Sequence, residues 1–233
     1  MTQKLMMAAT TLAIALFFCT SQLATAQDSS TPKGLLTYMQ QALNAQQQDA
    51  FLACFDATEE KKLALTAMYE LLYSLESFTT QMKSTYKDVK LPIPEGGQFG
   101  NFRNPQWVAE FTFTPKDATT VVAIGKGTQP ITFVKLGEVW RIDPDNMLLA
   151  PGNKINPKVA TLTYNSIKKA LDMLIPHIGK EGVTADKINS QLVSAMKAIA
   201  VQAAQAAGIK TPQAPPKEST QPQAPAQPQQ AAP

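Results

Sequence analysis

The sequence predicts an α+β fold, in which N-terminal helices pack on a curved antiparallel sheet and two more helices follow. Two observations predict it. Apolar residues recur every three or four positions before residue 92 and after residue 156, as they do on one face of a helix. Between these regions the apolar period changes to two, which is typical of half-buried strands. Helices that precede and follow a sheet along the chain give an α+β layer arrangement.

The chain of 233 residues divides by composition into five segments. We expect a signal peptide at 1–26, a flexible N-terminus at 27–33, an α+β domain at 34–150, a C-terminal helical extension at 151–210 and a disordered tail at 211–233. The tail is rich in proline, glutamine and alanine and has no apolar periodicity. Such a segment cannot bury enough surface to offset its ordering entropy.

The N-terminus has the three parts of a secretory signal peptide. Lys4 supplies the basic region, Leu5–Phe18 is an apolar core, and Leu23–Ala26 ends in a small-x-small cleavage pattern. The apolar core is too short to span a bilayer comfortably. We therefore expect cleavage after Ala26 and a periplasmic or secreted protein.

Two alternatives to a cleaved signal peptide are a lipoprotein signal and a retained membrane anchor. Leu16 lies three residues before Cys19, as a lipoprotein signal requires, but Phe18 occupies a position that normally takes a small residue. No other stretch approaches the roughly 20 apolar residues of a transmembrane helix. We therefore expect no membrane span after cleavage.

The first predicted elements are helices. Apolar spacing predicts helical structure over Gly34–Phe55 with a break at Gln46–Asp49, where Asp49 can cap the second helix. A longer helix is predicted from Thr58, as the N-cap, to about Tyr86. Glycines and prolines between residues 92 and 100 predict a loop.

A meander of four antiparallel strands is predicted after this loop. The strands are Trp107–Thr114, Thr119–Ile124, Ile131–Leu136 and Val139–Asp143. Gly137 leads the two-residue connection between the last two strands, which suits a type II′ hairpin.

Two further helices are predicted after the sheet. Asn156 as cap and Pro157 at the first helical position indicate one start. The apolar face of this helix contains Val159, Leu162, Ile167, Leu171 and Leu174, and Pro176 ends or kinks it. The last helix is predicted from about Thr184 to Ala207 and stops at Gly208.

Two stretches of the chain resemble a known superfamily. They are the helical run from Tyr38 to Phe55 and the hairpin FVKLGEVWRID at Phe133–Asp143. Together they resemble exported bacterial members of the nuclear transport factor 2-like superfamily over residues 34–147. That superfamily has a cone-shaped fold ending in a hairpin that reads much like "VKxxGxWRID". The resemblance implies a cone-shaped pocket and admits isomerases, cyclases and non-catalytic proteins.

No catalytic residues can be assigned from this resemblance. Steroid-isomerase-like members use an aspartate base with a tyrosine and a protonated carboxylic acid as oxyanion donors. The nearest groups here are Tyr69, Tyr73 and Glu76 on the long helix and Glu110 on the first predicted strand. We interpret the tyrosines as packing residues with wetted hydroxyls and the glutamates as exposed.

Other reactive groups are sparse. Cys54 lies among apolar neighbours and is predicted to be a buried, inert thiol. The single histidine, His177, lies at a helix end, where we expect it to contact the last carbonyls. These two residues do not form a metal-ligand pattern, so no metal or cofactor is predicted.

Two short motifs are interpreted as turns. Gly125-Lys126-Gly127 is too short for a phosphate-binding loop and connects two strands. Asp143-Pro144-Asp145-Asn146 lacks the glycine and distant glutamate of a calcium-binding loop.

The charge balance points away from nucleic acids. Lysine and arginine number 21 against 18 acids, for a net charge of +3, and the basic residues are spread along the chain. The sequence therefore favours a non-catalytic binding or interaction protein of the cell envelope. Its partner would be an envelope protein, a polysaccharide or a small apolar ligand. The alternative is an isomerase- or cyclase-like enzyme acting on a small apolar substrate in a cone-shaped pocket.

Overall fold

A computed structural model of the protein describes residues 29–92, 102–125, 129–150 and 154–209. The helices are α2 (Pro32–Asn44), α3 (Gln48–Leu52), α4 (Glu59–Thr85), α5 (Pro157–Leu174) and α6 (Ala185–Ala206). The predicted signal peptide and tail lie outside the described residues, as does most of the turn at 125–127.

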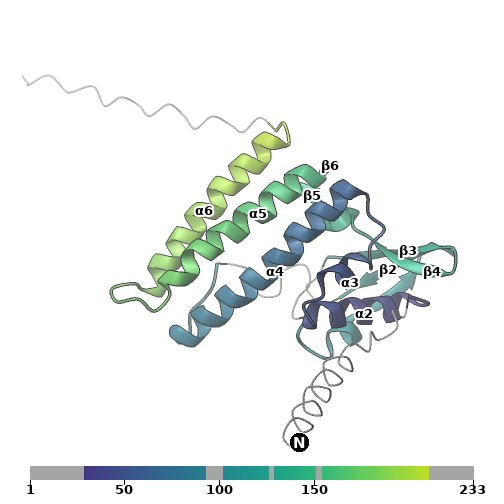
Figure 1. The fold of residues 1–233 in the computed structure, drawn as a ribbon, viewed down its shortest axis with the longest axis horizontal. Helices are drawn as coiled ribbons and strands as arrows, with labels where there is room; N and C mark the ends of the chain where they lie inside the picture. Colours follow the sequence, from purple (N-terminus) through teal and green to yellow (C-terminus); the bar gives the residue numbers. More distant parts are fainter. Residues whose placement is uncertain (1–28, 93–101, 126–128, 151–153, 210–233) are drawn as a thin grey trace, which may run out of the picture.

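Four strands form one antiparallel sheet in the order β1-β2-β3-β4. They are β1 (Thr112–Pro115), β2 (Thr120–Ile124), β3 (Ile131–Leu136) and β4 (Val139–Asp143). Two short strands, β5 (Leu149–Ala150) and β6 (Lys154–Ile155), form a separate pair. The predicted α+β class and the four-stranded meander are confirmed. Figure 1 shows α4, α5 and α6 side by side, with α4 next to the part that contains α2, α3 and the sheet.

Local cap chemistry sets the helix starts. Thr58 caps α4 by accepting a hydrogen bond from the Lys61 amide, and Asn156 caps α5 by accepting one from the Val159 amide, both as predicted. Helix α2 starts at Pro32, inside the segment predicted to be flexible. The reason is a Thr31 cap, whose hydroxyl accepts from the Gly34 amide at 3.0 Å, followed by proline at the first helical position.

The break between α2 and α3 lies where it was predicted, but the N-cap of α3 is a different residue from the one predicted. Gln46 adopts a left-handed φ of +56°, and the Gln47 amide donates to the Ala42 carbonyl at 2.9 Å. This turn ends α2 early enough for α3 to begin at Gln48, with Gln47 as its N-cap. Asp49 therefore lies in the first helical turn, and its predicted capping role is wrong.

The first predicted strand is also partly wrong. Trp107–Glu110 forms a 3-10 helix, and the strand starts only at Thr112. Asn104 begins the turn, because its side-chain oxygen accepts from the Gln106 amide at 3.0 Å and its carbonyl from the Trp107 amide at 2.9 Å. Asparagine before proline favours such a turn over an extended chain.

The hairpin between β3 and β4 has the predicted geometry. Leu136 pairs with Val139, and Gly137 between them has a φ of +63°, as the first position of a type II′ turn requires. The outer edge of β4 is covered. The Ile142 amide donates to the Cys54 carbonyl at 2.8 Å, and the Asp56 amide donates to the Ile142 carbonyl at 2.9 Å.

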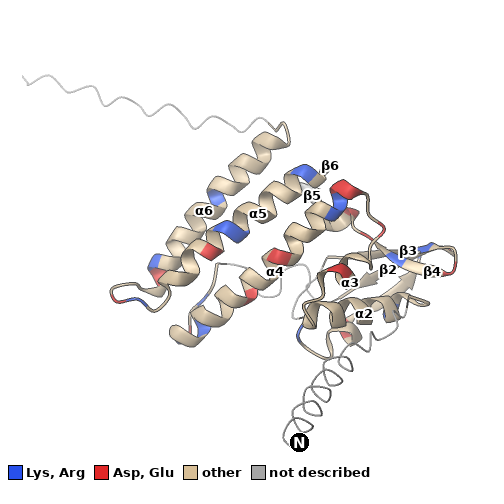
Figure 2. Cartoon of the chain, in the orientation of Figure 1, with Lys and Arg blue, Asp and Glu red and all other residues tan. Residues whose placement is uncertain are grey.

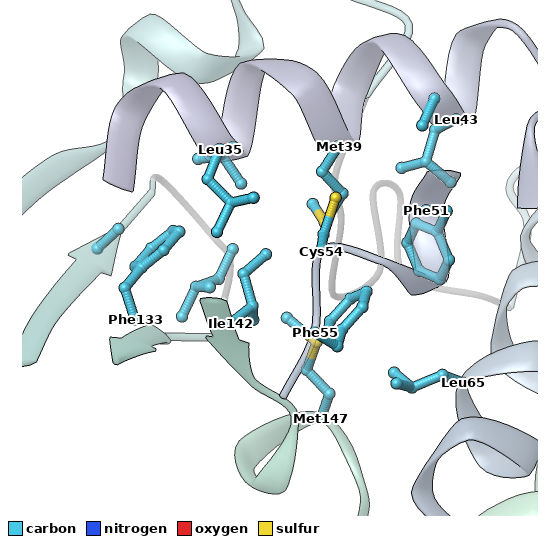
Figure 3. Close-up of a cluster of buried hydrophobic side chains, with 14 of the residues drawn as sticks. Leu35, Met39, Leu43, Phe51, Cys54, Phe55, Leu65, Phe133, Ile142 and Met147 are labelled. Atoms are coloured by element: carbon cyan, nitrogen blue, oxygen red, sulfur yellow. The ribbon is translucent and has the colours of Figure 1, made fainter. Parts of the chain in front are cut away.

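One hydrophobic core joins α2 and α3 to the sheet. Figure 3 shows Leu35 of α2 above Phe133 and Ile142 of the sheet, and Met39 and Leu43 of α2 above Cys54 and Phe51. Leu35, Met39, Cys54, Phe133 and Ile142 are all fully buried. The inner face of the sheet is thus covered by the chain's own side chains.

A second core lies within the layer formed by α4, α5 and α6. Ion pairs of Lys158 with Glu60 and of Lys168 with Glu70 show that α4 and α5 run parallel. Helix α6 runs back along α5. The shared buried residues are Leu71, Phe78, Met82, Leu171, Leu174, Ile188 and Leu192. Leu162, predicted on the apolar face of α5, is instead 43% exposed.

Helix α6 ends at the predicted glycine. Gly208 has a φ of +72°, and its amide donates to the Gln205 carbonyl while the Ile209 amide donates to the Ala204 carbonyl. This pair of bonds is the Schellman motif of a helix C-terminus.

Candidate functional site

An open apolar site lies at the turn between α5 and α6. Helix α5 ends at Leu174 and continues as a 3-10 turn over Ile175–His177, because Pro176 cannot extend the α-helix. Gly179 and Gly182, with φ of +79° and +71°, then reverse the chain into α6. The last turn of α5 and the first two turns of α6 therefore face each other.

A groove of about 370 Å³ lies between these helix ends. We call it the α5–α6 groove. Its lining is Met173, Leu174, His177, Val183, Lys187, Ile188 and Gln191. Leu174 and Ile188 are buried and form its floor, whereas Met173 is 58% exposed and stands at its margin. A concave apolar surface with a few polar groups is the usual form of a ligand site.

Tyr86 fixes one wall of this groove from α4. The Tyr86 hydroxyl donates to the Val183 carbonyl at 3.0 Å and accepts from the Gly179 amide at 3.1 Å. Both partners belong to the turn between α5 and α6, and Val183 lines the groove. The turn is therefore held against the C-terminal end of α4 rather than left free.

A second groove of about 310 Å³ lies on the opposite flank of α6. Its lining is Pro92, Leu192, Val193, Met196, Lys197 and Ala200. The Asn189 side-chain amide donates to the Lys90 carbonyl at 3.0 Å and holds the chain before Pro92 against α6. Helix α6 thus has a groove on each side, with an exposed lysine at each.

The residues singled out from the superfamily resemblance come together only in part. Tyr69 and Tyr73 stack edge to face on α4, with ring centroids 4.9 Å apart. The Tyr73 hydroxyl donates to the Leu43 carbonyl. Burial, followed by the hydrogen bond with Tyr69, raises the pKa of Tyr73. Tyr73 therefore stays neutral and is bound to backbone rather than to an open site.

Glu76 forms a bidentate ion pair with Arg103. The two guanidinium-to-carboxylate distances are 2.7 and 2.8 Å, and the hydrogen bonds to Glu76 raise the pKa of Arg103. Glu110 accepts a hydrogen bond from the Asn104 side chain at 3.4 Å, and its residue is exposed. Both glutamates therefore contact the segment that precedes the sheet.

The other residues considered from the sequence lie in the core or in a turn. Cys54 is fully buried, as predicted, and burial raises the pKa of its thiol to about 12. Asp143–Asn146 forms the predicted turn, in which the Asp143 carboxylate accepts from the Asp145 amide at 3.0 Å. Asp145 pairs with Lys61 of α4. Across the described ranges, no three histidine, cysteine or acidic side chains converge as metal ligands.

His177 lines the α5–α6 groove, and among the described residues its side chain makes no hydrogen bond to the last carbonyls of α5, in contrast to the expectation. The residues that surround it there, Met173, Lys187 and Gln191, were not singled out from the sequence. Met173 lies on the same face of α5 as Leu162, eleven residues earlier, and both side chains are exposed. Single exposed apolar residues are common on protein surfaces, so the sequence offered no signal that would have singled out Met173.

The chain matches no known family model, no curated protein and no solved structure. No helix within the described residues is both long and apolar enough to cross a membrane.

Proposed function

We propose that the protein is exported to the cell envelope, where it acts as a non-catalytic binding or interaction protein, and that the α5–α6 groove is its binding surface. One observation carries the proposal. The inner face of the sheet is covered by buried side chains such as Phe133 and Ile142, whereas the α5–α6 groove opens to solvent over an apolar floor. The signal-peptide pattern before Ala26 supports the export step.

The alternative function, an isomerase- or cyclase-like enzyme, has less support. It needs a pocket over the sheet with a base and oxyanion donors in it. Tyr73 and Glu76 are instead engaged with the Leu43 carbonyl and with Arg103. Both side chains therefore stabilise the chain's own conformation.

The resemblance to the nuclear transport factor 2-like superfamily stays a prediction for residues 34–147, as does a cone-like curvature of the sheet. Helices α2 to α4 before a four-stranded antiparallel meander support it. An experimental structure of the mature chain would test it, because its sheet curvature could be compared directly with superfamily members.

The binding function can be tested by capture from an envelope extract. The immobilised mature chain is compared with Met173→Glu, which places a charge at the groove margin, and with Val201→Glu as a control. Both residues are large, apolar and exposed, at 58% and 45%, but Val201 does not line the α5–α6 groove.

We expect the native protein and the Val201→Glu control to retain the same envelope component and Met173→Glu to lose it. Retention by all three proteins, or by none, would contradict the proposed binding surface. Export is checked separately by cell fractionation and N-terminal sequencing, which should find the mature chain starting at Gln27.

A further inference from the structure

The lining of the α5–α6 groove combines apolar and cationic or neutral polar groups. Met173, Leu174, Val183 and Ile188 supply apolar surface, and His177, Lys187 and Gln191 supply the polar groups. No carboxylate is among these lining residues. A ligand in the groove would therefore meet an apolar floor with hydrogen-bond donors and a positive charge at its margin.

Lys187 is available for a ligand. Within the described part of the chain it makes no ion pair, in contrast to Lys158 and Lys168, which pair with glutamates of α4. Figure 2 shows basic and acidic residues interspersed along α4 and α5. Lys187 also lies in the first turn of α6, where the helix dipole adds to the positive potential. Asp186 is its acidic neighbour, but it does not line the groove.

The size of the groove limits the ligand. A volume of about 370 Å³ is at the lower end of the 300–1,000 Å³ that is typical of small-molecule sites. Such a groove can take one short acyl chain, but it is small for a lipid with two chains. Burial of each methylene there removes apolar surface from water and so favours binding.

We infer that the α5–α6 groove binds a single-chain anionic amphiphile, with its acyl chain against Leu174, Val183 and Ile188 and its anionic head group beside Lys187. This inference rests on the proposed binding function and assigns the chemistry of its ligand. The positive charge of Lys187 favours an anionic head group, and the apolar floor of the groove favours an acyl chain. An apolar peptide segment of a protein partner is the competing occupant.

The test uses three amphiphiles with the same twelve-carbon chain, each below its critical micelle concentration. Laurate is anionic, dodecyltrimethylammonium is cationic and dodecyl maltoside is neutral. Isothermal titration calorimetry measures binding to the full mature chain. We expect saturable one-to-one binding of laurate that is about tenfold tighter than binding of the cation and that weakens as salt is raised.

Lys187→Glu and Lys197→Glu form a matched pair of variants. Both lysines are exposed on α6, but Lys187 lines the α5–α6 groove and Lys197 lines the second groove. Reversing the charge beside the head group should weaken laurate binding about tenfold in Lys187→Glu. The affinity of Lys197→Glu should stay unchanged.

Three outcomes would overturn the inference. Equal affinity for the three head groups would exclude charge recognition, and a loss in Lys197→Glu alone would place the ligand in the second groove. The third outcome is no binding of any amphiphile while envelope capture still depends on Met173. The proposed binding function would then stand with a different ligand. If envelope capture did not depend on Met173, both the proposed binding function and this inference would be contradicted.

Discussion

The Tyr86 hydroxyl donates a hydrogen bond to the carbonyl oxygen of Val183, 97 residues further along the chain, at 3.0 Å. The same hydroxyl accepts from the Gly179 amide, so it ties both sides of the turn between α5 and α6 to the end of α4. Tyr86→Phe removes both bonds and keeps the ring. We expect the free energy of unfolding to fall by about 1 kcal/mol per bond in urea titration.

Tyr38→Phe is the control for this substitution, because the Tyr38 hydroxyl makes no hydrogen bond with another described residue. Its unfolding midpoint should match that of the native protein. Equal midpoints for Tyr86→Phe and Tyr38→Phe would show that the turn is held by other contacts.

Gln40 holds the segment that leads into the sheet. This buried side-chain amide donates to the carbonyls of Phe102 and Asn104 at 2.8 and 2.7 Å. Gln40→Leu should cost about 1–3 kcal/mol of stability, because it leaves the Phe102 carbonyl without this buried donor and removes one of the two hydrogen bonds to the Asn104 carbonyl. Urea titration measures the loss, and Gln205→Leu on the exposed side of α6 should change stability little. A Gln40→Leu protein as stable as the native one would mean that these carbonyls find water instead.

The fold could be predicted from the sequence wherever local chemistry decides it. The Thr58 cap, the Asn156-Pro157 start and the Gly208 stop follow from side chains within three residues of each helix end. The 3-10 helix at Trp107–Glu110 has only part of its cause in the local sequence. Asn104 begins the turn from which it starts, but Gln40, more than 60 residues earlier in the chain, also holds that turn.

The candidate site could be predicted less well than the fold. Met173 and Lys187 become neighbours only because the turn held by Tyr86 brings α6 back along α5. The sequence instead drew attention to Tyr69, Tyr73 and Glu76, because residues one turn apart on a helix are close in space wherever the helix packs. Their actual partners, Leu43 and Arg103, come from other segments and could not be read from that spacing.

Cys54 makes stability depend on pH in the alkaline range. Burial raises the pKa of its thiol from 9.0 to about 12, so the folded state favours the protonated form. The contribution of the Cys54 thiol to the free energy of unfolding is fully present below pH 9 and is lost as the pH rises toward 12. We expect the stability difference between the native protein and Cys54→Ala to shrink over this range, as measured by denaturant titration at several pH values. A constant difference would mean that the thiol ionises as easily in the folded protein as in the unfolded one.

Helix α6 is part of the folded core, and we expect the segment after it to be dispensable for stability. A chain ending at Lys210 should melt at the same temperature as the full mature protein, because α6 is already capped at Gly208. A chain ending at Gly182 loses the fully buried Ile188 and Leu192. Each contributes about 1.5–3 kcal/mol, a large share of the 5–15 kcal/mol of an ordinary domain. Aggregation or a clearly lower melting temperature is expected, and an unchanged one would place α6 outside the core.

We propose that the amphiphile binds in the α5–α6 groove and not inside the sheet. Methionine methyl groups report on both places, because Met173 lines the groove while Met39 and Met147 are buried in the core beneath the sheet. The most direct measurement is methyl NMR of the mature chain labelled at methionine and titrated with laurate. We expect the Met173 signal to shift while those of Met39 and Met147 stay fixed. An unchanged Met173 signal, with or without shifts at Met39 and Met147, would contradict it.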